Sequence, residues 1–500
     1  MTESHPLDAP IAELARAVAS GAVSAESVAL ESLSRIRDGS ELNAFLTVSD
    51  ATTLETARSL DSRRKRGEAL GKLAGVPIVV KDALCTRDAP TTAASKVLTR
   101  RGPDGRPSGP SSGYRPPYDA TVVERLRAAG ALLVGKANMD EFAMGSSGEN
   151  SAFGPAKNPI DPRFSPGGSS SGSAVAVAAQ MAPAALGSDT GGSIRQPAAF
   201  CGIVGVKPSY GRVSRYGLIA FASSLDQVGP FARDVRSAAL VLEVIAGEDP
   251  RDSTAAKLPV GNYVAACDRD VRPLRIGVPE EYFAEGLDPE VAAAVRGMIE
   301  RLGREGCSIR PVKLPHTRYG VATYYIVATA EASSNLARFD GVRFGLRIEP
   351  EHGDLRALYG ATRDAGFGAE VKRRILLGTY VLSAGYYDAY YRRAQRARTL
   401  IRRDFDQAFS EVDVIAAPTS PTPAFRLGEK VDDPLAMYLA DVYTLPASLA
   451  GIAGISVPCG ATRATSDRPS LPIGLQLLSP AFAEETLFTL AAGVERLVAA

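Results

Sequence analysis

The sequence predicts an α/β protein built on a parallel sheet, and three segments between residues 71 and 134 carry this prediction. Residues 76–80 (Val-Pro-Ile-Val-Val) and 131–134 (Ala-Leu-Leu-Val) are short apolar runs, the pattern of strands that are buried on both faces. Residues 120–129, between them, have the composition of a helix. A strand, a helix and a strand in this order indicate two parallel strands joined by a right-handed crossover.

The other elements follow from similar patterns. Residues 1–70 are predicted to be helical, because Ser24 can cap a helix and apolar residues then recur at helical spacing, at Val28, Leu30, Leu33 and Ile36. Residues 274–278 predict a strand, and Asp288-Pro289-Glu290 predicts the start of a helix. Residues 101–117 are rich in glycine, proline, serine and arginine, which predicts an exposed loop.

Length and composition argue against several classes of protein. The 500 residues are 45% hydrophobic and 23% charged, which is typical of a soluble protein with two or three domains or one large one. The longest apolar run, residues 174–186, is too short to span a bilayer, and the N-terminus lacks the pattern of a secretory signal. We therefore expect a cytoplasmic protein without membrane contact. A net charge of +1 gives no overall field that would attract nucleic acid.

Cysteine and histidine are too scattered for a disulfide framework or a metal centre. The five cysteines include no Cys-x-x-Cys pair, which predicts buried thiols in a reducing compartment and no zinc site. The three histidines, His5, His316 and His352, lie beside no glycine-rich turn. A Ser-His-Asp triad is therefore not expected, and a serine nucleophile would need a different base.

Three segments carry candidate chemistry. Lys81-Asp82 follows the strand at 76–80, residues 166–173 read Pro-Gly-Gly-Ser-Ser-Ser-Gly-Ser, and residues 189–197 read Asp-Thr-Gly-Gly-Ser-Ile-Arg-Gln-Pro. A Gly-Ser run is commonly a linker, and a lysine after a strand is commonly a solvated strand end. Here the Gly-Ser run leads directly into helix-forming residues 174–179, which favours a turn of backbone N–H groups at a helix start.

A phosphate-binding loop competes with serine chemistry as an interpretation. Residues 130–136 fit Gly-x-x-x-x-Gly-Lys, but Ala137 stands where a serine or threonine would bind Mg²⁺, and the intervening residues read as a strand. A lysine at the end of a buried strand can have its pKa lowered from about 10.4 towards 7 or 8, so that it acts as a base. The glycines before Ser193 let backbone N–H groups approach an oxyanion, each donor contributing roughly 3–4 kcal/mol.

The two glycine-serine segments closely resemble the signature of the amidase signature family. The resemblance implies one large α/β domain, a central mixed sheet flanked by helices, and a Ser-cisSer-Lys triad without a metal. In this sequence the nucleophile would be Ser193, the base Lys81, and the relay between them Ser169, with Ser170 as an alternative relay. The oxyanion hole would be formed by the backbone N–H groups of Thr190, Gly191, Gly192 and Ser193.

Further segments resemble the A-subunit family of glutamyl-tRNA(Gln) amidotransferases. They lie between about residues 71 and 460, at 138–147, 211–217, 335–345 and 370–391. This resemblance implies a glutamine pocket in which Arg373, or its neighbour Arg374, clamps the substrate carboxylate. Asp441 would hold the substrate ammonium group, and Tyr324 would line the pocket.

The same resemblance implies a reaction and partners. Glutamine would be hydrolysed through a glutamyl ester of Ser193, and ammonia would pass to a B subunit that amidates Glu-tRNA(Gln) or Asp-tRNA(Asn) with ATP and Mg²⁺. A small C subunit would complete a heterotrimer, tRNA would be bound mainly by the partner, and this chain would need no cofactor. We expect a helical segment at 1–70, the signature core at 71–240, and the remaining pocket and partner surface at 241–500.

Other interpretations stay open beside this one. A free-standing amidase that acts on a small neutral amide would need neither Arg373 nor Asp441. A non-catalytic scaffold would be free to lose the triad, which is intact. Residues 386–398 mix tyrosine and arginine, which fits a solvated basic helix or a subunit interface better than direct RNA contact. Residues 101–115 resemble an insertion that affects the surface and partner docking rather than the chemistry.

Overall fold

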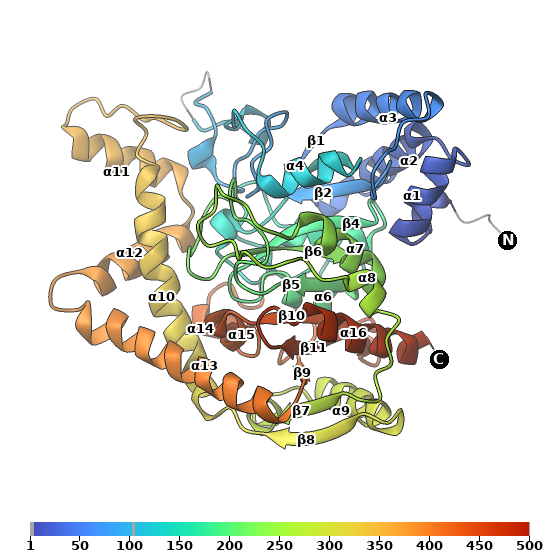
Figure 1. Ribbon diagram of the computed structural model, residues 1–500. Coiled ribbons are helices and arrows are strands. Elements are labelled where there is room, and N and C mark those ends of the chain that lie inside the picture. Colours follow the sequence, from blue (N-terminus) through green and yellow to red (C-terminus); the bar gives the residue numbers. More distant parts are fainter. Residues whose placement is uncertain (1–4, 103–105, 500) are drawn as a thin grey trace.

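The computed structural model describes residues 5–102 and 106–499, and within these residues eleven strands form one mixed sheet (Figure 1). The order of the strands across the sheet is β1-β3-β2-β4-β6-β5-β10-β11-β9-β7-β8. The strands are β1 Phe45–Val48, β2 Pro77–Lys81, β3 Leu132–Ala137, β4 Ala184–Asp189, β5 Val204–Lys207, β6 Gln227–Ala232, β7 Arg275–Pro279, β8 Ser308–Val312, β9 Val414–Pro418, β10 Ala453–Ala461 and β11 Pro472–Ser479.

Two parallel units lie in the two halves of the sheet, and antiparallel strands join them. β2 pairs in parallel with β3 and β4. β7 pairs in parallel with β8 and β9. The pairings that connect these units, such as β4 with β6 and β10 with β11, are antiparallel. The predicted strand–helix–strand unit is present as β2, α4 (Thr121–Ala128) and β3, so the predicted α/β class with a mixed sheet is confirmed.

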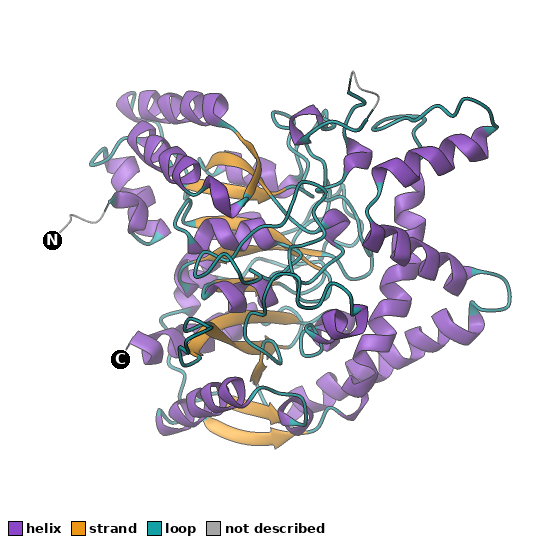
Figure 2. Cartoon of the chain, turned by 180° about the vertical axis from the view of Figure 1, so that it is seen from behind, coloured by secondary structure: helices purple, strands orange, loops and turns teal. Residues whose placement is uncertain are grey.

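Helices flank the sheet on both sides (Figures 1 and 2). The remaining α-helices are α1 Ile11–Ser20, α2 Ala25–Asp38, α3 Asp50–Lys65, α5 Ser171–Ala178, α6 Arg195–Cys201, α7 Val235–Ile245, α8 Tyr263–Ala266, α9 Pro289–Arg304, α10 Gly320–Asn335, α11 Leu355–Gly366, α12 Ala369–Leu382, α13 Arg393–Glu411, α14 Pro434–Leu439, α15 Leu445–Ala450 and α16 Glu484–Ala499. No helix in the described ranges is long and apolar enough to cross a membrane.

Helices α10 to α13 stand together at one side of the molecule, on the left in Figure 1, and we call them the helical arm. Within it, α10 packs against both α12 and α13. The approach of α12 to α10 is closest at Gly378, where a Cβ atom would lie 1.9 Å from the carbonyl oxygen of Thr329. A side chain at this position would force the two helices apart, so the glycine sets which face of α12 points inward.

The N-terminal segment contains one element that its sequence pattern did not predict. Ser24 caps α2 by accepting a hydrogen bond from the Ser27 N–H at 3.0 Å, as expected. Leu30 is 48% exposed, however, and does not belong to the buried face of that helix. Residues 45–48 form β1, a half-buried strand antiparallel to β3, in a region predicted to be helical. Four residues are too few to show a clear alternation of apolar and polar side chains.

The far edge of the sheet is formed by β8, which pairs in parallel with β7. Four of its five residues are exposed, and Arg310 and Pro311 lie within it. β7 and α9 match the strand predicted at 274–278 and the helix start predicted at Asp288, whose side chain caps α9.

Two more predictions concern the cysteines and the loop at 101–117. The five cysteines are all free and buried, as expected. The loop is largely exposed or half-buried where it is described and holds one short 3-10 helix at Pro110–Ser112, while residues 103–105 lie outside the described residues. The boundaries expected near residues 70 and 240 stay predictions.

Candidate active site

Lys81 is the last residue of β2, and its ammonium nitrogen reaches three serine hydroxyls. Lys81 Nζ lies 2.8 Å from Ser169 Oγ, 2.9 Å from Ser170 Oγ and 2.9 Å from Ser188 Oγ. Ser188 lies on the neighbouring strand β4, whereas Ser169 and Ser170 precede the first turn of α5. The parallel pairing of β2 with β4 therefore brings the base to the predicted relay.

Burial sets the protonation state of this lysine. Lys81 is completely buried, and loss of hydration lowers its pKa to about 7. The carboxylates of Asp140, Asp189 and Asp226 oppose this effect by favouring the charged form. Because the pKa lies near neutrality, a large fraction of Lys81 is neutral at physiological pH and can accept a proton.

The two candidate relay serines have different hydrogen bonds. The Ser170 hydroxyl also donates to the carbonyl oxygen of Ser188 at 3.1 Å and accepts from the Ser188 N–H at 3.3 Å. Among the described residues, the Ser169 hydroxyl contacts Lys81 alone, so it is available to a second partner. The Gly168–Ser169 peptide bond is cis, as the family resemblance implied. The geometry favours Ser169 as the relay.

Ser193 lies on the turn between β4 and α6, and it is 7% exposed. Its carbonyl oxygen accepts a hydrogen bond from the Ser170 N–H at 3.2 Å, which joins the two serine segments. In the part of the chain that the structure describes, the backbone N–H groups of Thr190, Gly191, Gly192 and Ser193 donate to no acceptor. These four free donors beside a serine hydroxyl can stabilise an oxyanion.

A buried ion pair holds this turn in place. Arg195 donates through Nε and Nη2 to the two carboxylate oxygens of Asp189, both at 3.0 Å, and neither side chain is exposed. The remaining terminal nitrogen of Arg195 donates to the carbonyl oxygen of Thr444 at 3.0 Å. At the other end of the turn, the Thr190 hydroxyl donates to Asp226 at 2.7 Å. The turn is therefore fixed from both sides.

Two residues of the expected glutamine pocket lie against the same turn. A Cβ atom at Gly191 would be 2.8 Å from Cζ of Tyr324 and 2.9 Å from its hydroxyl oxygen. A Cβ atom at Gly192, where φ is +157°, would be 2.2 Å from Thr444 Oγ1 and 3.2 Å from Asp441 Oδ1. Glycine is required at both positions, because the pocket wall approaches the backbone so closely.

Asp441 has one carboxylate oxygen without a partner. Its Oδ2 accepts a hydrogen bond from the Ser146 hydroxyl. Its Oδ1 is buried and, within the described residues, makes no hydrogen bond. Burial raises the pKa of Asp441 to about 7, whereas the Ser146 hydrogen bond and the positive charges of Arg195 and Arg374 lower it. A buried carboxylate oxygen without a donor can accept a hydrogen bond from a cationic ligand.

The two candidate arginines of α12 differ in their exposure. Arg374 is 3% exposed and lies over the rings of Phe221, Tyr325 and Tyr438 at 5.1–5.6 Å, and its charge acts on the pKa of Asp441. The Arg373 side chain is 46% exposed on the outer face of the helix. The structure therefore does not bring Arg373 into the pocket, and the alternative residue Arg374 fits the predicted carboxylate clamp.

A family model described as Amidase matches residues 27–488. The chain belongs to the amidase family. The predicted membership of the amidase signature family is thereby confirmed.

Relatives of this amidase indicate which members of the family it resembles. It is 59% identical to the A subunit of the glutamyl-tRNA(Gln) amidotransferase of Acidobacterium capsulatum, over 96% of this chain and 98% of that one. The crystal structure of the corresponding A subunit from Thermotoga maritima is 39% identical, with a TM-score of 0.78 over 99% and 96% of the two chains. The native peptide amidase of Stenotrophomonas maltophilia is 30% identical, with a TM-score of 0.78 over 99% and 97%. The predicted resemblance to the A-subunit family is confirmed.

Several residues of this amidase site were not assigned from the sequence. Asp189 and Arg195 stand inside the quoted signature, but only the structure shows that they form an ion pair. Gln196 links three segments, because its amide donates to the Ser146 carbonyl at 2.7 Å and accepts from the Gly168 N–H at 3.0 Å. Such contacts depend on residues that are far apart in the sequence.

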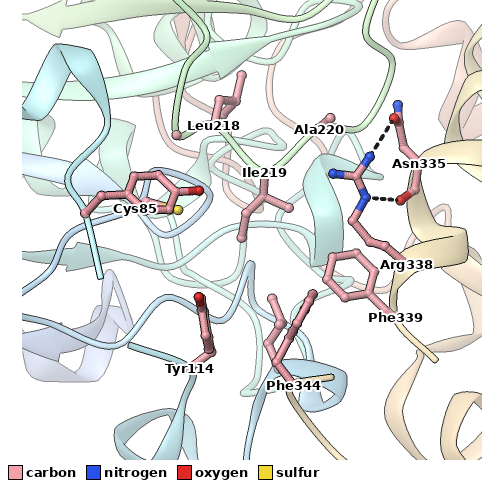
Figure 3. A pocket seen from close by; sticks show the side chains of 12 residues that line it. Cys85, Tyr114, Leu218, Ile219, Ala220, Asn335, Arg338, Phe339 and Phe344 are labelled. Carbon is pink, nitrogen blue, oxygen red and sulfur yellow. Dashed lines mark hydrogen bonds between the residues drawn. The ribbon is translucent and has the colours of Figure 1, made fainter. Parts of the chain in front are cut away.

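Two other features of the amidase do not take part in this site. Lys136, the lysine of the competing phosphate-loop interpretation, lies in β3, where it is buried, donates to Thr91 Oγ1 at 2.7 Å and pairs with Asp82 at 3.2 Å. A cavity of about 220 Å³ is lined by aromatic and apolar side chains and by Arg338, which is held by Asn335 (Figure 3). None of the predicted site residues lines this cavity.

Proposed function

We propose that this chain is the glutamine-hydrolysing amidase subunit of a glutamyl-tRNA(Gln) amidotransferase. The observation that carries the proposal is a pair of opposite charges: Asp441 lies against the turn that holds Ser193, and the positive charge of the buried Arg374 acts on Asp441. A free amino acid presents a carboxylate and an ammonium group, and a pocket that recognises both needs one charge of each sign. The relatives named above support the same assignment.

In the proposed reaction, Ser169 carries protons between Ser193 and neutral Lys81. As Ser193 Oγ attacks the side-chain amide carbon of glutamine, its proton moves to Ser169, and the Ser169 proton moves to Lys81 Nζ. The backbone N–H groups of residues 190–193 bind the oxyanion that forms. The C–N bond then breaks, the proton returns by the same route to the leaving nitrogen, and ammonia departs from a glutamyl ester. Water cleaves the ester by the same proton transfers and releases glutamate.

The pocket residues orient the substrate for this attack. Arg374 binds the carboxylate, because it is buried whereas Arg373 is exposed. Its planar guanidinium offers two parallel hydrogen bonds to a carboxylate. The free Oδ1 of Asp441 accepts a hydrogen bond from the ammonium group. Tyr324 closes the pocket above Gly191. A neutral amide would use neither charge and would leave Oδ1 of Asp441 buried without a partner, at a cost of about 1–3 kcal/mol.

The proposal includes partners outside this chain. B and C subunits complete the complex, the B subunit uses ATP and Mg²⁺ to activate Glu-tRNA(Gln) or Asp-tRNA(Asn), and it also carries most of the tRNA binding. This chain supplies ammonia and holds no cofactor of its own. The cytoplasm is the compartment that the proposal requires, because charged tRNA and glutamine are present there.

A reaction with two nitrogen sources tests the proposal. The complex of this chain with the B and C subunits is expected to form Gln-tRNA(Gln) from Glu-tRNA(Gln) with either glutamine or ammonium chloride. The complex that carries Ser193→Ala should use ammonium chloride only, because the variant cannot release ammonia from glutamine.

The rival function is a free-standing amidase. Hydrolysis of simple neutral amides by the wild-type chain, with no ammonia released from glutamine in the presence or absence of the B and C subunits, would establish the rival and overturn the proposal.

A further inference from the structure

The outer face of α12 exposes large apolar side chains. Leu376 is 70% exposed, Leu377 44% and Tyr380 47%. Residues three and four positions apart share one face of a helix, and the opposite face of α12 packs against α10 around Gly378. A leucine with 70% of its surface in water gains almost no stabilisation from burial. These side chains therefore do not stabilise the core of the chain itself.

Tyrosines extend this apolar surface beyond the end of α12. The ring centroid of Tyr380 lies 4.4 Å from that of Tyr386 and 5.9 Å from that of Tyr390, although both partner rings are about two-fifths exposed. Tyr390 lies in a single π-helical turn, Asp388–Arg392, which leads into α13. We call Leu376, Leu377, Tyr380, Tyr386 and Tyr390 the arm face.

The segment that carries the arm face is rich in basic residues, although the chain as a whole carries a net charge of +1. Between residues 372 and 403 there is one acidic residue, Asp388, and there are nine basic ones: Lys372, Arg373, Arg374, Arg392, Arg393, Arg396, Arg398, Arg402 and Arg403. Among the described residues, Arg393, Arg396 and Arg403 form no ion pair. A partner that covers this face therefore needs carboxylates around an apolar centre.

The arm face fits a protein better than an RNA. An RNA-binding surface offers separate aromatic faces on which bases stack. Here three tyrosine rings already pack on one another, and two exposed leucines lie beside them. Tyrosine and arginine around an apolar centre are instead the residues that carry most of the binding energy at protein interfaces.

We propose that the arm face docks an acidic protein partner, and that docking acts on the glutamine pocket through α12. The inference rests on the proposed function, which identifies this partner as one of the other subunits of the amidotransferase. It adds where that partner binds and what its binding changes.

Glu370 connects the arm face with the pocket. Its Oε1 accepts hydrogen bonds from Arg374 Nε at 2.7 Å and from the Tyr438 hydroxyl at 3.0 Å, while its Oε2 pairs with Arg373. One carboxylate thus binds the exposed arginine outside and the buried arginine inside. A partner carboxylate that binds Arg373 leaves Glu370 to Arg374 and Tyr438, which fixes the Arg374 guanidinium more firmly for the substrate carboxylate.

The test measures the affinity of the purified B and C subunits for this chain. Leu376→Glu with Leu377→Glu places two negative charges in the centre of the arm face and is expected to weaken binding at least 100-fold. The matched control is Leu30→Glu, a similarly exposed leucine on α2, on the opposite side of the molecule (Figure 1), which should bind like wild type. Circular dichroism and the midpoint of thermal unfolding verify that each variant is folded.

A second variant tests the charges and the coupling. Arg393→Glu with Arg396→Glu should slow association and remove much of its dependence on salt, because charges at an interface rim act mainly on the association rate. Arg373→Ala frees Glu370 from Arg373 without a partner, so in the isolated chain it should lower KM for glutamine a few-fold and leave kcat unchanged. At saturating concentrations of the B and C subunits its KM should match wild type.

Each other outcome overturns the inference. Wild-type affinity of the Leu376→Glu, Leu377→Glu variant for the subunits shows that the partner binds elsewhere. Loss of tRNA binding with unchanged subunit binding assigns the face to RNA, and a change in the oligomeric state of the isolated chain assigns it to a second copy. A wild-type chain that binds neither subunit overturns the proposed function as well, so the two failures are distinguishable.

Discussion

The catalytic residues and the amino-acid pocket meet at one turn, but they come from two different parts of the molecule. Lys81 and the nucleophile turn are attached to the central strands β2 and β4. Tyr324 and Arg374 are side chains of α10 and α12 in the helical arm. The sheet fixes backbone positions through ladders of hydrogen bonds, whereas the arm presents side chains that can be exchanged without moving those strands.

This difference indicates how one scaffold serves several substrates. A change in the arm alters which amide is held beside Ser193, while the proton transfers at the sheet stay the same. The peptide amidase with a TM-score of 0.78 at 30% identity is consistent with this division, because its name gives a different substrate on the same fold.

The largest effect is expected from the loss of the catalytic base on the sheet. Lys81→Met should lower kcat for glutamine by about 10⁴-fold or more, because removing one member of a catalytic triad removes most of its effect. Ammonia release measures the change. Lys207→Met is the matched control, since Lys207 is equally buried, burial also lowers its pKa to about 7, and it donates to the Pro208 carbonyl rather than to a serine. Similar losses in both variants would contradict a specific function of Lys81.

The next largest effect is expected from the loss of a pocket arginine in the helical arm. Arg374→Ala should raise KM for glutamine about 100-fold, because a charged hydrogen-bond pair to the substrate carboxylate is lost, at about 1.5–3 kcal/mol. Arg373→Ala is its matched control and should change KM far less. Steady-state kinetics with γ-aminobutyramide, which lacks the carboxylate, should show little difference between Arg374→Ala and wild type. A larger effect of Arg373→Ala would reverse the assignment of the clamp.

The pH dependence separates the catalytic base from the carboxylate of the pocket in wild type. Lys81 acts as a base only when neutral, so kcat/KM should fall about tenfold per unit as the pH decreases below about 7. Asp441 binds an ammonium group only when ionised, and its raised pKa of about 7 adds a second proton to the same fall for glutamine. With glutaramate, which lacks the ammonium group, the fall should have the slope of one proton. Equal slopes for the two substrates would remove Asp441 from ammonium binding.

The smallest effect is expected from the loss of the hydrogen bond between Ser146 and Asp441. Ser146→Ala removes the hydrogen bond that lowers the pKa of Asp441, so its pKa should rise and KM for glutamine near pH 7 should increase about fivefold, or about 1 kcal/mol. Ser147→Ala is the control, because the Ser147 hydroxyl is buried without a partner among the described residues. A pH profile of kcat/KM distinguishes a shifted pKa from a general loss of packing, which would leave the profile unmoved.

The sequence predicted the sheet side of the site better than the arm side. Lys81 follows an apolar run, and Ser169 and Ser193 lie in glycine-rich turns, so local patterns point to these segments, and the resemblance to the amidase signature family then suggests which residues act. The choice between Arg373 and Arg374 needs the rotation of α12 about its axis, which tertiary packing determines. The ion pair of Asp189 with Arg195 and the contact of Ser146 with Asp441 join distant segments, and β1 is too short to show an alternation. Local patterns do not contain these relations.

The free edge of the sheet at β8 affects the tendency of the chain to aggregate. A strand with an unpaired edge is a template for other chains and can start aggregation. In β8, Pro311 offers no N–H to a neighbouring strand, and Arg310 would place a charge at the contact between β8 and an added strand. The sheet can therefore remain open at this end without pairing with the strands of other chains, even at high protein concentration.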